Sequence, residues 1–136
     1  MKFALITLVA LAVAGSAAAA PRNATLTIKH QMYGCHSWSF DGHSMSATET
    51  IKLVRGGALT VVDNDVMPHK LIQVSGPKAT ITNRVSMMHM GATAHIGFPA
   101  KGTYVLRTRA GEDYPYAKNV KTVGEDNVLK LVVTVV

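Results

Sequence analysis

The stretch Leu59-Thr60-Val61-Val62-Asp63-Asn64-Asp65-Val66-Met67-Pro68-His69 decides the fold of this chain. Its first five residues alternate as a β-strand does, and the turn-forming residues that follow end the strand. A second strand-like run, Leu71-Ile72-Gln73-Val74, begins just after His69. The histidine is therefore expected at the rim of a β-sheet. Pro68 restricts the backbone of its neighbours, so the turn that presents the imidazole is expected to be stiff, as a metal ligand requires.

The same short alternation recurs along the chain and predicts about eight strands. The strand-like runs cover residues 24–30, 51–53, 59–61, 72–74, 81–85, 92–98, 104–108 and 129–135. Turn formers such as Gly56-Gly57 and Gly76-Pro77 separate these runs, and helical periodicity is not sustained after residue 20. Residues 31–46 are expected to be irregular. The pattern predicts an all-β fold, an antiparallel two-sheet Greek-key β-sandwich.

The first 20 residues have the layout of a secretory signal peptide. Lys2 precedes an apolar run over residues 3–14, and a small-residue segment with an A-x-A cleavage site follows. The apolar run is too short to span a bilayer comfortably, which disfavours the alternative of an uncleaved anchor. We expect residues 1–20 to be removed and residues 21–136 to form one domain, periplasmic or secreted, with no membrane span.

The charge and cysteine content exclude some partners. The formal net charge is +6, and +5 once Lys2 is removed (6 − 1). The basic residues are spread singly along the chain without runs, which argues against a nucleic-acid partner. Docking to an acidic redox partner stays open. The single cysteine, Cys35, cannot form an internal disulfide, so its thiol is buried, joined to another molecule, or bound to a metal.

Sulfur and imidazole side chains gather in three places along the chain. These are Cys35-His36 with His43 and Met45 nearby, Met67 with His69, and Met87-Met88-His89-Met90. Thiolate and thioether favour Cu(I), and imidazole accommodates both oxidation states of copper. Zinc would accept cysteine and histidine but would leave the methionines without a role. The sequence therefore predicts copper as the cofactor.

Three segments resemble the cupredoxin family of copper-binding β-sandwiches. They are Gly56-Gly57-Ala58 leading into a strand, Asn64-Asp65 followed by Met67-Pro68-His69, and Phe98-Pro99-Ala100-Lys101-Gly102-Thr103-Tyr104. The resemblance covers residues 51–108 and implies a sandwich in which His69 is a copper ligand. In the family, the strand that contains the tyrosine leads into a loop with cysteine, histidine and methionine ligands. Here Thr108 stands in the place of that cysteine, and residues 101–136 contain none of the three residue types.

A relocated copper site is predicted because the usual ligand loop is missing. Its ligands are Cys35, His36, His69 and Met90, which together have the His₂Cys plus axial Met composition of an electron-transfer copper centre. Adjacent residues on a strand point to opposite faces, so Cys35 and His36 bind together only if Gly34 lets the chain bend.

Alternatives stay open at this site. Met87 could bind the metal in place of Met90, and His89 could bind it in place of His36. The pair His43-x-Met45 is a candidate for a second, weaker Cu(I) site.

Other side chains near these clusters are assigned no ligand role. Met67 is expected to pack within its loop, and His30 to cap the core at a strand end. His95 is expected to face solvent, and Trp38 to lie in the core next to the site.

The sequence contains no catalytic signature of the G-x-S-x-G, H-E-x-x-H or cysteine-protease type, so we expect no enzyme activity. The first candidate function is an exported, copper-binding, cupredoxin-like one-electron carrier. The second is a periplasmic copper chaperone or sequestration protein without redox duty. Its partners would be the copper ion and either a redox partner or a copper-receiving protein. A third candidate is a cupredoxin-like binding domain that has lost its metal.

Overall fold

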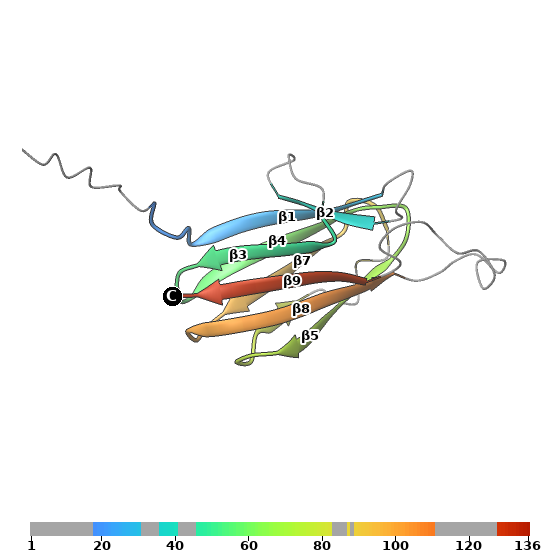
Figure 1. The fold of residues 1–136 in the computed structure, drawn as a ribbon. Coiled ribbons are helices and arrows are strands. Elements are labelled where there is room, and N and C mark those ends of the chain that lie inside the picture. The colour runs from blue at the N-terminus through green and yellow to red at the C-terminus, as the bar shows by residue number, and fades with distance from the viewer. Residues whose placement is uncertain (1–17, 31–35, 41–45, 83–86, 88, 111–127) are drawn as a thin grey trace, which may run out of the picture.

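The computed structural model describes residues 18–30, 36–40, 46–82, 87, 89–110 and 128–136 (Figure 1). The described strands are β1 (Asn23–His30), β2 (His36–Phe40), β3 (Thr48–Leu53), β4 (Gly57–Asn64), β5 (His69–Ser75), β6 (Thr80–Thr82), β7 (Thr93–Phe98), β8 (Gly102–Ala110) and β9 (Val128–Val135). They form a five-stranded sheet in the order β2-β1-β4-β7-β6 and a four-stranded sheet in the order β3-β9-β8-β5. The prediction of an all-β, two-sheet sandwich is confirmed.

The strand pairing is mixed rather than wholly antiparallel. In the five-stranded sheet β1 runs parallel to β4, with Leu26 opposite Val61. In the four-stranded sheet β3 runs parallel to β9, with Ile51 opposite Val133. Alternation along one strand identifies its buried face but not the direction of its neighbour. The expectation of an antiparallel sandwich is therefore corrected for these two pairs.

Strand β2 lies in a segment that we expected to be irregular. It pairs antiparallel with β1, with Trp38 opposite Ile28. Ser37 and Ser39 are buried as well as Trp38, so the strand is covered on both faces and lacks the usual contrast between apolar and polar positions. The indole Nε1 of Trp38 donates a hydrogen bond of 2.9 Å to the carbonyl of Lys130 in β9. This bond joins the two sheets.

The core lies between the sheets and is built from alternate residues of each strand. Its largest fully buried side chains include Trp38, Tyr104 and Phe98. The hydroxyl of Tyr104 donates to the carbonyl of Ala100 at 2.7 Å and accepts from the Ala100 N–H at 3.2 Å. The Tyr104 ring meets Phe98 edge-on, with ring centroids 4.9 Å apart. We call these contacts of Tyr104 with Ala100 and Phe98 the Tyr104 corner. They fix the start of β8 and therefore also the position of its far end.

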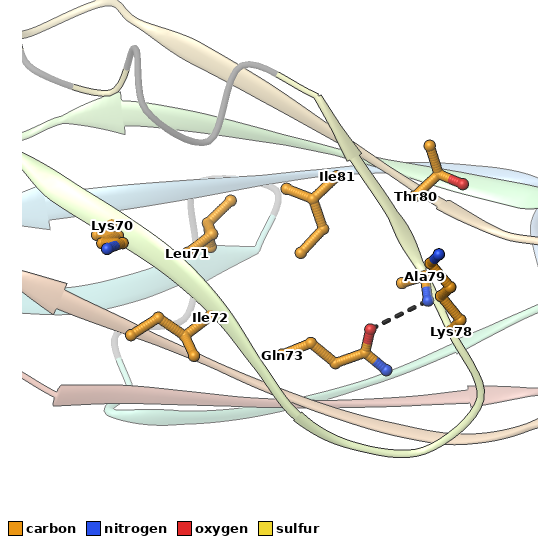
Figure 2. Close-up of a pocket in the computed structure, with 8 residues that line it drawn as sticks. All are labelled: Lys70, Leu71, Ile72, Gln73, Lys78, Ala79, Thr80 and Ile81. Carbon is orange, nitrogen blue, oxygen red and sulfur yellow. Dashed lines mark hydrogen bonds between the residues drawn. The ribbon is translucent and has the colours of Figure 1, made fainter.

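A groove of about 790 Å³ lies between the edge strands β5 and β6 (Figure 2). Gln73 closes one end of it, since its side-chain amide donates to the carbonyl of Pro77 at 2.6 Å and accepts from the N–H of Ala79 at 3.0 Å. The residues that line the groove are Lys70, Leu71, Ile72, Gln73, Lys78, Ala79, Thr80 and Ile81. None of them is a histidine, cysteine or acidic residue, so the groove offers no strong metal ligand.

The expected signal peptide falls largely on residues 1–17, which lie outside the described residues. Within the described residues no helix is long and apolar enough to cross a membrane. The carbonyl of Pro21 accepts a hydrogen bond of 3.1 Å from Val54, and the carbonyl of Arg22 accepts one of 2.9 Å from Ala58. The described chain is therefore joined to the sandwich from residue 21 onward.

Candidate metal centre

Three histidines and one aspartate meet at one end of the sandwich, and we call them the histidine-aspartate cluster: His30, His36, Asp65 and His69. His30 ends β1 and His36 begins β2, and the two are directly opposite each other in the strand register. Asp65 follows β4, and His69 begins β5. Since β1 and β4 are parallel neighbours, their carboxyl ends reach the same edge, which brings Asp65 to the two histidines.

The Asp65 carboxylate lies at the centre of the cluster. A short hydrogen bond joins its Oδ2 to Nδ1 of His36, and the same oxygen lies 3.1 Å from Nε2 of His69. Its Oδ1 lies 3.4 Å from Nδ1 of His30. The rings of His36 and His69 are perpendicular, with centroids 4.8 Å apart. His36, Asp65 and His69 are buried, whereas the His30 side chain is 45% exposed and forms the rim.

Hydrogen bonds between backbone N–H groups and aspartate side chains hold the turn around Asp65 in place. The N–H of Met67 donates to Oδ1 of Asp65 at 3.1 Å, and the N–H of Asp65 donates to Oδ1 of Asp63, also at 3.1 Å. Such side-chain-to-backbone bonds are the reason that aspartates favour turns. The turn that sequence analysis interpreted as a support for His69 therefore also positions a carboxylate.

His69 is fixed by contacts from two other parts of the chain. Its Nδ1 lies 3.3 Å from the hydroxyl of Thr108 in β8. Its backbone N–H donates to the carbonyl of Met87 at 2.9 Å. The N–H of Asp63, which lies beside the cluster, donates to the carbonyl of Ala92 at 2.8 Å. Met87 is therefore joined to His69, and Ala92 is joined to the end of β4.

The two aspartates have opposite pKa shifts. Burial alone would raise the pKa of Asp65, but its hydrogen bonds with His36 and His69 outweigh burial and lower that pKa well below its usual range. Burial raises the pKa of Asp63 to about 6, against the attraction of His69 and the hydrogen bond from the Asp65 N–H. Asp65 is therefore an anion at neutral pH, held between imidazoles.

The cluster has the donor atoms and spacing of a metal site. His30, His36 and Asp65 each offer one ligand atom, and these three atoms lie within 4.8 Å of one another. The Nε2 atom of His36 is buried and has no hydrogen-bond partner among the described residues. Metal-binding histidines commonly bond their other ring nitrogen to a carboxylate, as Nδ1 of His36 does with Asp65. The residues present therefore fit a transition-metal ion.

The structure brings together two of the predicted ligands, His36 and His69. Cys35 lies outside the described residues. Met90 is 55% exposed, and its alternative, Met87, is fully buried. His89 is exposed, and its Nδ1 lies 3.1 Å from the carbonyl of Met90. The pair at residues 43 and 45 is also outside the described residues.

The residues that were given no ligand role fall into two groups. Trp38 is in the core, Met67 is buried in its turn, and His95 is exposed with its Nδ1 3.2 Å from the hydroxyl of Thr60, all as expected. His30 differs from its prediction. It does not cap the core, because its half-exposed ring is turned to the Asp65 carboxylate.

Asp63 and Asp65 were not predicted as site residues, because Asp63 was assigned to the strand and Asp65 to the turn that follows it. One signal was present, since Asp63 continues the alternation of the buried Leu59 and Val61 and so was placed on the core side. An acidic residue in a core position needs a partner, and that requirement points to a nearby histidine. Nothing in the sequence indicates that the partner of Asp65 is as distant as His36.

The comparisons with known proteins leave the family open. No protein-family model matches the chain, and no curated protein matches it. Among solved structures, a cysteine protease inhibitor from Entamoeba histolytica is similar, with a TM-score of 0.41 and 10% identity, covering 85% of this chain and 99% of the inhibitor. A multicopper oxidase from Campylobacter jejuni has a TM-score of 0.39 and 15% identity, covering 84% of this chain and 25% of the oxidase. At these scores neither likeness assigns a function.

Proposed function

We propose that this protein is an exported, cupredoxin-like copper-binding protein that holds one copper ion at the histidine-aspartate cluster and sequesters or delivers it. The observation that supports this most directly is the contact of one buried carboxylate with three imidazoles from separate parts of the chain. The export part of the proposal depends on the signal-peptide pattern of residues 1–20.

A bound metal ion accounts for the cluster better than a purely structural hydrogen-bond network does. A buried polar atom without a partner is costly, and Nε2 of His36 is such an atom among the described residues. A network that only stabilised the fold would be expected to satisfy both nitrogens of a fully buried imidazole. An ion bound to Nε2 of His36 would satisfy this nitrogen, and Asp65 would then orient the ring from Nδ1 as an outer-shell carboxylate rather than bind the same ion.

The choice of copper over zinc is supported by the affinity order and by the neighbouring sulfur atoms. Imidazole and carboxylate bind several divalent ions, and among first-row metals Cu²⁺ binds such sites most tightly. Met67 and Met87 are both buried. Met67 lies two residues before His69 in the chain, and the Met87 carbonyl accepts a hydrogen bond from the His69 N–H. Their thioethers would suit Cu(I), so the same end of the sandwich would accommodate either oxidation state.

Sequestration or delivery fits the described ligands better than electron transfer does. His30 is half-exposed at the rim and provides an entry and exit point for the ion. The described donors are nitrogen and carboxylate oxygen, without the thiolate of an electron-transfer copper site. One observation keeps the electron carrier as a second candidate. Cys35 immediately precedes His36, a member of the cluster, in the sequence.

The first experiment is a metal titration of residues 21–136. Trp38 is the only tryptophan and lies two residues from His36, so its fluorescence is expected to be quenched by Cu(II). We expect His36→Ala and His69→Ala to weaken Cu(II) binding by about 100-fold or more. His95→Ala is the matched control, because this histidine is exposed and contacts Thr60 instead. Unchanged affinity in both cluster variants would rule out the proposed site.

The two candidate functions are separated by the visible spectrum of the Cu(II) complex. An intense charge-transfer band that disappears in Cys35→Ser would indicate a copper-thiolate bond and would favour the electron carrier. A weak band that is unchanged in Cys35→Ser would favour sequestration or delivery by histidine and carboxylate.

A further inference from the structure

The outer surface of the four-stranded sheet is strongly basic. We call it the basic face, defined by the exposed residues Lys52, Lys70, Arg107 and Lys130 with the half-buried Val105 and Val132. The outward positions of the described residues in β3, β9, β8 and β5 include no acidic residue, since Glu49 alternates with Thr50 and shares the side of the buried Ile51. Figure 1 shows β8 and β9 at the centre of this sheet.

Two cations on this face are placed directly against each other. Lys130 of β9 is opposite Arg107 of β8 in the antiparallel register, and both side chains are exposed. Directly opposite side chains on one face have Cβ atoms about 5 Å apart, where like charges are destabilising. Every ion pair among the described residues involves Asp65, so no described carboxylate neutralises this pair. Within the described part of the chain this is an unfavourable pair, and a bound anion would reduce its repulsion.

The neighbouring positions extend the pair into a docking surface. Val105 and Val132, the next outward residues on the same two strands, are opposite each other. Arg107 is opposite Ile72 of β5, and Lys70 is the next outward residue on that strand. An apolar centre flanked by cations that have no carboxylate partner among the described residues has the composition of a protein-binding surface for an acidic partner.

We propose that the basic face binds an acidic surface of another protein. Its apolar side chains, Val105, Val132 and Ile72, are all half-buried, and none of them is an aromatic side chain of the kind that anchors a protein in a membrane. It also presents no aromatic ring on which a nucleic-acid base could stack. The charge is localised, because Lys29 is the one described lysine or arginine at an outward position on the strands of the opposite sheet. The inference does not depend on copper binding.

The test uses a fluorescein-labelled poly-L-glutamate peptide as the acidic probe and fluorescence anisotropy as the readout, at low and at physiological ionic strength. We expect Arg107→Glu and Lys130→Glu each to weaken binding by about 10-fold or more. Lys29→Glu is the matched control, with the same charge change on the opposite face, and should change binding by about 2-fold at most. Equal losses in all three variants would show that net charge alone attracts the probe and would overturn the proposal.

Two further results test the same surface. Vesicles of anionic phosphatidylglycerol should bind more weakly than the peptide, and vesicle binding without peptide binding would overturn the proposal. Lys130→Glu replaces the like-charge pair with an opposite-charge pair facing Arg107, so we expect its Tm to rise by about 2–4 °C while binding falls. A lower Tm would contradict the repulsion on which the inference rests.

Discussion

The hydroxyl of Thr108 lies 3.3 Å from Nδ1 of His69, at the far end of the strand that begins near the Tyr104 corner. Thr108 is fully buried, and its strand position is directly opposite Leu71, two residues after His69. The resemblance to cupredoxins assigns this position to the copper-binding cysteine. The contact therefore joins the two positions for which the resemblance implies copper ligands, Thr108 and His69.

Thr108→Cys is expected to create a copper-thiolate site. The new sulfur would lie next to His69, and a thiolate with imidazole ligands gives the composition of an electron-transfer copper centre. Visible absorption after addition of Cu(II) should show an intense charge-transfer band, measured in a Cys35→Ser background so that no other thiol contributes. Thr82→Cys, at an exposed position on β6, is the control and should give no such band. A weak spectrum in Thr108→Cys would show that the contact does not extend to a shared metal site.

Asp65→Asn is expected to weaken both the fold and metal binding. The amide retains an oxygen for the Met67 N–H but loses the charge that accepts from His36 and His69. Loss of charged hydrogen-bond partners inside a protein costs about 2–3 kcal/mol, and loss of a carboxylate behind a metal-binding histidine reduces affinity about 10–100-fold. Urea denaturation and Cu(II) titration measure the two effects. Wild-type values in both experiments would contradict the central role of this carboxylate.

Asp65 is also expected to make the free energy of unfolding decrease at acidic pH. Its folded pKa lies below the unfolded value, so its contribution is present above about pH 4 and is lost as the pH falls further. The urea concentration at the unfolding midpoint of the wild-type protein should decrease as the pH is lowered below 4. The decrease should be smaller in Asp65→Asn. A parallel fall in both proteins would contradict this assignment.

Asp63→Asn is expected to stabilise the protein at neutral pH. The folded pKa of about 6 lies above the unfolded value, so the folded state binds the proton more tightly and stability decreases as pH rises from about 4 to 6. A shift of about 2 units corresponds to roughly 2–3 kcal/mol at most. Asparagine keeps the acceptor for the Asp65 N–H without the charge. The difference between the two denaturation curves should grow between pH 4 and 7, and a constant difference would contradict the assignment.

Trp38→Phe is expected to destabilise the sandwich by about 1–3 kcal/mol, because the Lys130 carbonyl loses its donor and the ring leaves unfilled volume. Chemical denaturation followed by circular dichroism measures this loss, since the variant has no tryptophan fluorescence. Phe40→Leu, at a half-buried position on the same strand, is the control and should cost less. Equal costs would mean that the hydrogen bond between sheets contributes little.

Much of the fold could be predicted from local pattern, because burial alternates with a period of two along strands such as β4, β7 and β9. Residues such as Val61 and Leu131 were placed on the core side by their neighbours alone, and both are fully buried. Strand β2 was missed because Ser37 and Ser39 are buried too, which removes the contrast that reveals a strand. The parallel pairs were missed because neither partner carries information about the direction of the other.

The candidate site was only half predictable for a related reason. His36 and His69 were predicted as ligands from their residue type and from the residues next to them in the sequence. Asp65 lies 29 residues from His36, and Thr108 lies 39 residues from His69. The first contact exists only after β2, β1 and β4 have paired, and the second only after β5 and β8 have paired. Ligand chemistry can be inferred from residue type, but the partners of a ligand depend on tertiary structure.

The position of β9 in the four-stranded sheet determines when this protein can fold. β9 lies between β3 and β8, and it is the strand neighbour of β3 among the described residues. A growing chain that has reached residue 110 contains eight of the described strands but cannot join β3 to the rest of its sheet. The four-stranded sheet can be completed only once residues 128–135 have been synthesised, so we expect the sandwich to be completed later than one built from successive hairpins.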